Sequence, residues 1–274
     1  MIRVLHRVLI LGLVLVSGCR PTEEAIAPSH TIVTTLPVLG LIIESIASGF
    51  DTQVLLKDGQ SPHGFQVSPT QAKQLSRASL LIFAHPAIDG WAADLAENER
   101  LALWSSEQDE DAHYWTDPVA VQDALKAISD ALCVLEPSNC TLFRRNATAF
   151  SVRIDSVSQQ IAFKLEAVRG ACYLVAHPFM TQFMDRYGIK SVGPIQPLPG
   201  HDASPRTLSS MMEEATRLKC GALLVQQAVD NRSMNALAKD LGIRVVEVEP
   251  LGTNQASYES YLESLSNALL SELE

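Results

Sequence analysis

The sequence predicts an α/β protein of two lobes, in which each lobe is a mostly parallel sheet flanked by helices and one long spine helix joins the lobes. Three observations carry this prediction. Short β-type runs alternate with helical patterns from His30, the same alternation starts again at Cys172, and one amphipathic stretch separates the two series. Strands that alternate with helices indicate a parallel sheet covered by helices.

The first series predicts strands at residues 31–36, 53–56 and 80–83, with helices between them. The second of these helices has the clearest start. Ser68 stands at the N-cap, Pro69 at the first helical position and Gln71 three residues after the cap, which is the pattern of a capping box. Similar helix starts follow at Asp117-Pro118 and Ser204-Pro205.

The spine helix is predicted over residues 141–169, because apolar residues recur there at steps of three and four. These residues are Phe143, Ala147, Phe150, Ile154, Val157, Ile161, Leu165 and Val168. At ~1.5 Å per residue such a helix is about 40 Å long, which is enough to cross a whole domain. A rigid helix of this length is expected to limit hinge opening between the lobes.

The second series predicts strands at residues 172–176, 192–195, 222–225 and 244–248, again separated by helices. We therefore place an N-terminal lobe at residues 30–140 and a C-terminal lobe at residues 170–274. The length of 274 residues suits two lobes of about 100 to 150 residues, each with its own core.

The N-terminus has the pattern of an export signal. Arg3 and Arg7 precede an apolar stretch that is too short to span a bilayer, so residues 1–18 are predicted to be a signal peptide. The end of this stretch, Val16-Ser17-Gly18-Cys19, resembles the lipobox of bacterial lipoproteins. Cys19 would then carry the lipid and residues 19–29 would tether the protein to a membrane. The alternative is ordinary cleavage near Gly18, which leaves Cys19 free.

The composition excludes several classes of protein. A chain that is 47% hydrophobic and 19% charged is neither disordered nor collagen-like. With 21 basic against 31 acidic residues the net charge is −10, and removing Arg3 and Arg7 with the signal peptide makes it −12. Nucleic-acid binders need a basic face, so we expect no nucleic-acid partner. We also expect a monomer.

The four other cysteines form an even set in a protein that is expected to be exported into an oxidising compartment. Cys133 and Cys140 flank a short turn, where a local disulfide is natural. Cys172 and Cys220 each begin an apolar run that reads as a strand, and neighbouring strands could pair them. The alternative, a zinc site made of all four, lacks the C-x-x-C spacing.

Three histidines stand where strands lead into loops or just before helices: His63, His113 and His177. Glu249 occupies the matching place after the strand at 244–248. Ligands of open α/β sheets bind outside the carboxyl ends of the strands, and three imidazoles with a carboxylate suit tetrahedral zinc. For any one histidine, a capping or surface role is the alternative. His201 and Asp202, before a capped helix, are rival ligands.

Several motifs resemble a known family, and they extend over nearly the whole chain after the tether. They are Pro62-His63-Gly64-Phe65 with Ser68-Pro69, His113-Tyr114-Trp115-Thr116-Asp117-Pro118, His177-Pro178-Phe179 with Tyr187-Gly188, and Glu249-Pro250-Leu251-Gly252-Thr253. In these the chain is similar to the ZnuA-type solute-binding lipoproteins of ABC importers for zinc and manganese.

The resemblance implies one metal ion in a cleft between two α/β lobes, held by His63, His113 and His177, with Glu249 or water as the fourth ligand. It implies capture of Zn²⁺ outside the cytoplasm, in the periplasm or at the cell surface, and delivery to an ABC permease. Manganese-type relatives place a carboxylate at the third position, so His177 favours zinc over Mn²⁺. A zinc hydrolase is a further alternative, but the sequence has no H-E-x-x-H element and no enzyme is expected. An adhesive surface module is the last alternative.

Overall fold

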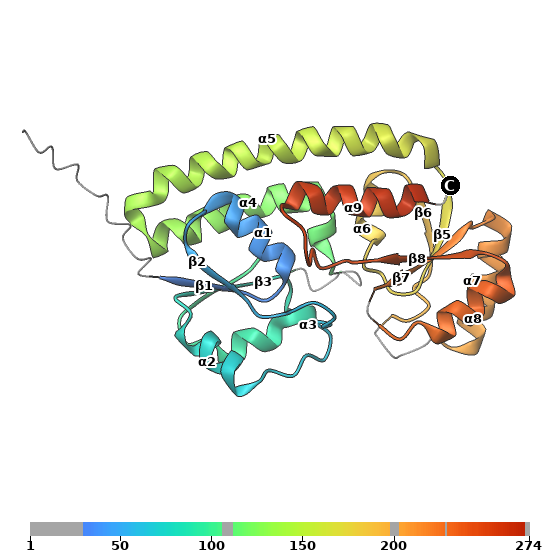
Figure 1. Ribbon diagram of the computed structural model, residues 1–274, viewed down its shortest axis with the longest axis horizontal. Helices are drawn as coiled ribbons and strands as arrows, with labels where there is room; N and C mark the ends of the chain where they lie inside the picture. Colours follow the sequence, from blue (N-terminus) through green and yellow to red (C-terminus); the bar gives the residue numbers. More distant parts are fainter. Residues whose placement is uncertain (1–29, 106–111, 198–202, 228, 272–274) are drawn as a thin grey trace, which may run out of the picture.

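The computed structural model describes residues 30–105, 112–197, 203–227 and 229–271. It shows two separate four-stranded parallel sheets with helices packed around them, which confirms the predicted fold class (Figure 1). Among the described residues, no helix has both the length and the apolar character needed to cross a membrane. The proposed signal peptide, Cys19 and the tether lie outside the described residues.

The N-terminal sheet has the strand order β2-β1-β3-β4. Its strands are β1 (Thr31–Thr34), β2 (Asp51–Val54), β3 (Leu80–Phe83) and β4 (Glu99–Ala102). The predicted strand at 53–56 begins and ends two residues earlier, although Leu55 and Leu56 still donate backbone hydrogen bonds to Thr34 and Thr35. Sequence patterns did not reveal β4, an edge strand whose first two residues are exposed.

Helices of this lobe are α1 (Pro37–Ile46), α2 (Pro69–Arg77), α3 (Pro86–Asp89) and α4 (Pro118–Leu135), with 3-10 turns at Gly90–Leu95 and Tyr114–Thr116. The capping box of α2 is present: Ser68 Oγ accepts from Gln71 N, and the Gln71 side chain accepts from Ser68 N. Asp117 caps α4 by accepting from Val119 N. Both helix starts that the sequence predicts here therefore exist.

The C-terminal sheet has the order β6-β5-β7-β8, which is the order of the first sheet repeated. Its strands are β5 (Cys172–Val175), β6 (Lys190–Val192), β7 (Ala222–Gln226) and β8 (Arg244–Val248). The helices are α6 (Thr181–Arg186), α7 (Pro205–Leu218), α8 (Arg232–Leu241) and α9 (Tyr258–Leu270).

The spine helix is α5 (Cys140–Leu165), followed by a 3-10 turn at Glu166–Val168. Figure 1 shows it running along both lobes, with α9 beside it. Its buried residues are those of the predicted apolar stripe. Because α5 also packs on α1 and α4, one helix contributes to the cores of both lobes.

The four cysteines form two disulfides, Cys133–Cys140 at the turn between α4 and α5 and Cys172–Cys220 between the starts of β5 and β7. Disulfides are therefore present as expected, with the two pairings that the sequence suggests without deciding. The alternative of a zinc site made of these four cysteines is therefore wrong, because each cysteine sulfur is bonded to another sulfur.

Candidate metal centre

His63 lies in the loop between β2 and α2, at the carboxyl end of the first sheet. The loop is fixed by Trp91, whose Nε1 donates to the Pro62 carbonyl at 3.1 Å and whose ring packs on Phe65 at 4.9 Å between centroids. Gly64 has a backbone φ of +69°, a conformation that residues with a Cβ atom rarely adopt. The turn that presents the imidazole therefore depends on the glycine beside it.

His113 directly precedes the 3-10 turn that leads into α4. Its carbonyl accepts from the backbone N–H of Thr116, and its ring meets the Trp115 ring edge-on at 5.1 Å. Trp115 is fully buried and donates from Nε1 to the Pro250 carbonyl of the other lobe at 2.7 Å. Sequence patterns did not reveal Trp115 as a support of the site, because its partner lies 135 residues away.

His177 follows β5 and is nearly buried. Its Nδ1 lies 3.1 Å from the Gln196 carbonyl, which can only accept, so the Nδ1–H tautomer satisfies this contact; in that tautomer Nε2 carries the lone pair that can bind an ion. The carbonyl is held in place because Gln196 N donates to Ala176 O and Ile195 N to Val175 O. Gln196 is a second residue that sequence patterns did not reveal.

The three imidazoles converge. One possible ligand atom from each lies within 4.8 Å of the others, and Nε2 of His63 is 3.1 Å from Nε2 of His177. Two nitrogens bound to one tetrahedral zinc at about 2.0–2.1 Å would lie about 3.3 Å apart. His63 and His113 come from the first lobe and His177 from the second, so an ion here would sit between the lobes.

The environment of the cluster strongly lowers the pKa of one of its members, His63. Burial, and then the nearby His113 and His177, lower the pKa of His63 from 6.5 to about 3. At neutral pH His63 is therefore unprotonated and able to bind a metal.

Glu249 stands after β8, in a loop of the C-terminal lobe that packs on the first lobe. Its two carboxylate oxygens accept from Leu251 N at 3.0 Å and from Thr253 N at 2.7 Å. Burial raises its pKa, while these hydrogen bonds oppose the rise. Within the part of the chain that the structure describes, Glu249 is not among the side chains grouped with the three histidines.

The loop after Glu249 joins the two lobes. The Pro250 carbonyl accepts from Trp115 Nε1 and from the Tyr261 hydroxyl, and the Leu251 carbonyl accepts from Val38 N at the start of α1. Gly252 has φ of +76° and packs so closely that a Cβ would lie 3.1 Å from that of Val38. The loop thus fixes the C-terminal lobe to the segments that carry His113 and begin α1.

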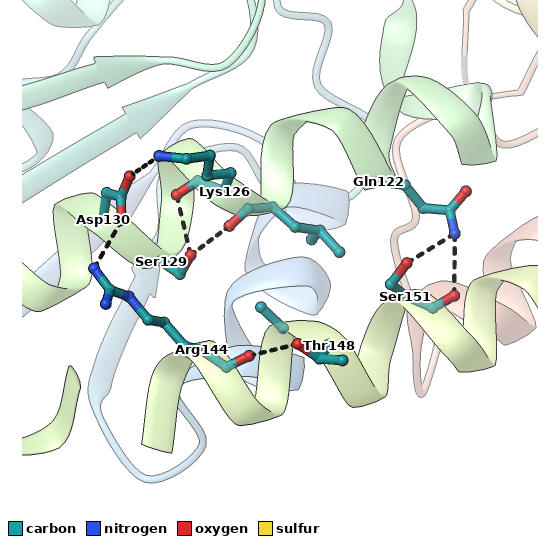
Figure 2. Close-up of a pocket in the computed structure, with 9 residues that line it drawn as sticks. Gln122, Lys126, Ser129, Asp130, Arg144, Thr148 and Ser151 are labelled. Atoms are coloured by element: carbon teal, nitrogen blue, oxygen red, sulfur yellow. Dashed lines mark hydrogen bonds and ion pairs between the residues drawn. The ribbon is translucent and has the colours of Figure 1, made fainter. Parts of the chain in front are cut away.

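The rival ligands His201 and Asp202 lie outside the described residues. A different hollow, a groove of about 610 Å³ between α4 and α5, is drawn in Figure 2. Its cations Lys126 and Arg144 both contact Asp130, and no imidazole lines it. It is therefore not a candidate for the metal centre.

Comparisons with known proteins identify the family of this chain. A family model described as "ZnuA: Zinc-uptake complex component A periplasmic" matches residues 32–271. The high-affinity zinc uptake system protein ZnuA of Yersinia pestis is 26% identical, over 89% of this chain and 91% of the relative. The iron ABC transporter substrate-binding lipoprotein MtsA of Streptococcus pyogenes serotype M1 is 21% identical, over 86% of this chain and 84% of its own.

Solved structures share the fold. A crystal structure of ZnuA superposes with a TM-score of 0.78 at 20% identity, covering 88% of this chain and 98% of that one. The periplasmic zinc binding protein TroA from Treponema pallidum gives a TM-score of 0.78 at 17% identity, covering 89% and 99%. Because the family model extends over nearly all of both lobes, the chain belongs to the ZnuA family of periplasmic zinc-uptake components, which are solute-binding proteins rather than enzymes.

Proposed function

We propose that His63, His113 and His177 bind the Zn²⁺ ion that this solute-binding protein carries as its cargo. One observation supports this most strongly: the three imidazoles, from both lobes, place their ligand atoms within 4.8 Å of one another. Neutral imidazole nitrogen is a good ligand for zinc and a poorer one for the harder Mn²⁺.

The fourth ligand in this proposal is Glu249 or a water molecule. The Glu249 carboxylate is held by backbone N–H groups of its own loop, those of Leu251 and Thr253, so an ion bound here would share the carboxylate oxygens with these donors. A Glu249→Gln variant that loses zinc affinity would favour the carboxylate; one that keeps it would favour water.

Delivery to an ABC permease follows from membership of the family. Two finer points belong to the proposal: the protein acts as a monomer, and lipid on Cys19 anchors it to a membrane outside the cytoplasm. Expression of the full chain with a labelled fatty acid tests the anchor. The wild type should incorporate the label and a Cys19→Ser variant should not, while gel filtration of the soluble domain reports the oligomeric state.

The metal assignment is tested by titrating the metal-free protein with zinc against a chromophoric chelator. His113→Ala and His177→Ala should each weaken binding at least about 100-fold, which is about 2.7 kcal/mol. His30→Ala is the matched control, since His30 lies beside Glu136 and outside the cluster. Unchanged affinity in both cluster variants, or tighter binding of Mn²⁺ than of Zn²⁺ by the wild type, would contradict the assignment.

A further inference from the structure

An ion pair joins the two lobes close to the histidines. Arg186, the last residue of α6, donates from Nε to Oδ1 of Asp117 at 2.9 Å and from Nη2 to Oδ2 at 2.6 Å. The Asp117 side chain is 9% exposed and that of Arg186 is 39% exposed. A bidentate guanidinium–carboxylate pair fixes both distance and orientation, unlike a single contact between mobile side chains.

On the first lobe, the pair holds the segment that carries His113. Asp117 lies four residues after this histidine, across the 3-10 turn. The turn is closed by backbone hydrogen bonds from Thr116 to His113 and from Asp117 to Tyr114, and Asp117 also caps α4. The carboxylate therefore has little freedom to move independently of His113.

On the second lobe, the pair holds the segment that carries His177. Phe179 N donates to the His177 carbonyl, Met184 N to the Met180 carbonyl, and the aromatic and methionine side chains of this segment are buried. Arg186 is thus connected to His177 through the eight residues of packed chain between them. The rings of His113 and His177 lie 4.9 Å apart between centroids, so small shifts of either segment would change the site.

We propose that Asp117 and Arg186 are positioning residues that set the separation of His113 and His177 and so raise the affinity for the ion. The inference rests on the proposed function of the histidines. Its physical basis is preorganisation: if the pair is lost, the two segments must be brought together when the ion binds, and that cost lowers affinity. Outer contacts that orient metal ligands typically contribute 10- to 100-fold in affinity.

Three variants isolate this effect. Arg186→Met keeps an unbranched apolar stem and removes the guanidinium, and should weaken zinc binding about 10- to 100-fold. Asp117→Asn keeps a good N-cap for α4 and weakens only the pair, so it should shift affinity in the same direction. Arg186→Lys should not restore full affinity, since an ammonium cannot make the two coplanar contacts.

Arg153→Met is the matched control. Arg153 on α5 pairs with Glu259 on α9 at 2.7 Å, which is another contact between distant segments but one outside the segments that carry the histidines. This variant should bind zinc as the wild type does.

The experiment measures zinc affinity by chelator competition, the visible spectrum of bound Co²⁺ as a report on ligand geometry, and urea unfolding of the metal-free protein. We expect Arg186→Met and Asp117→Asn to lose affinity and alter the Co²⁺ spectrum beyond any change in Arg153→Met, with the double variant no worse than Arg186→Met. Wild-type affinity in the folded Arg186→Met and Asp117→Asn variants overturns the inference. So does a loss of affinity that follows only the loss of stability.

These results are distinct from a failure of the proposed function itself. If the wild type does not bind zinc, or if His113→Ala binds it equally well, the metal assignment is wrong. If the wild type binds zinc, His113→Ala does not, and the Arg186 and Asp117 variants match the wild type, the assignment stands and the positioning role is wrong.

Discussion

The two sheets share one strand order but are covered differently. In the N-terminal sheet, all four residues of β3 belong to a single continuous core, although successive side chains point to opposite faces. In the C-terminal sheet, the two faces pack in different hydrophobic cores. Tyr173 and Val175 of β5 pack in that same large core, whereas Cys172 and Leu174 pack in a smaller one with α7 and α8.

This difference shows how the two lobes are joined to each other. The large core continues from the first lobe through α5 and α9 to one face of the second sheet, so the boundary between lobes is not a boundary between cores. The cluster of His63, His113 and His177 has members in both of the lobes that this core joins. The layer of α7 and α8 is peripheral, and it is held by a small core and a disulfide.

The largest expected effect comes from breaking the shared core. Phe150 on α5 is fully buried and meets Tyr258 of α9 edge-on at 5.9 Å. Phe150→Ala should lower the free energy of unfolding by about 3–5 kcal/mol and loosen both lobes together. Met234→Ala in the small core should cost less, near the lower end of the ~2–5 kcal/mol range. Urea unfolding measures both, and a larger loss in Met234→Ala would contradict the division of cores.

Removing each disulfide sharpens the same comparison. The disulfide between Cys172 and Cys220 joins residues 48 positions apart. The disulfide between Cys133 and Cys140 joins residues only 7 positions apart. Loop entropy alone assigns about 4 kcal/mol to the first bridge and about 2 kcal/mol to the second. Replacing each pair by alanine should therefore destabilise the peripheral layer more than the turn between α4 and α5. Equal losses in thermal and urea unfolding would show that loop length does not govern the difference.

Acid should affect the region where the lobes meet. The pKa of His63 is about 3 in the folded metal-free protein against an ordinary 6.5, so between these values the unfolded chain binds more protons. The free energy of unfolding should consequently decrease as the pH falls from about 6.5 toward 3. Above pH 6.5 the contribution of His63 to stability should be fully present. Unfolding measured in the presence of a chelator should show a shallower dependence in His63→Gln. An unchanged slope would mean that His63 is not buried as a neutral imidazole.

The smallest effect belongs to a helix cap of the peripheral layer. Ser204 Oγ accepts from Thr207 N at the start of α7. Ser204→Ala should cost about 1 kcal/mol, without any change in zinc affinity, because the cap lies outside the shared core. Ser204→Asp should retain the stability. A drop in zinc affinity in Ser204→Ala would show that the outer layer is coupled to the metal centre.

The sequence by itself determined the local structure and the kind of site. The cap at Ser68, the apolar stripe of α5 and the alternation of strands with helices depend on residues within a few turns of one another, and each was found in the structure. The sequence also singled out His63, His113 and His177 by their residue type and their place at the ends of strands. It missed β4 because the charged Glu99 and Arg100 conceal an edge strand, which needs only one neighbour to form.

Tertiary structure decided everything that depends on distant partners. The nitrogens of His63 and His177, 114 positions apart, lie 3.1 Å from each other only because the two sheets are fixed along α5. The contacts of Trp115 with Pro250 and of Arg186 with Asp117 leave no periodic trace in the sequence, because their geometry depends on how the lobes pack. Local hydrogen bonds and hydrophobic periodicity fix the elements, whereas the distances among ligands are set by contacts between elements.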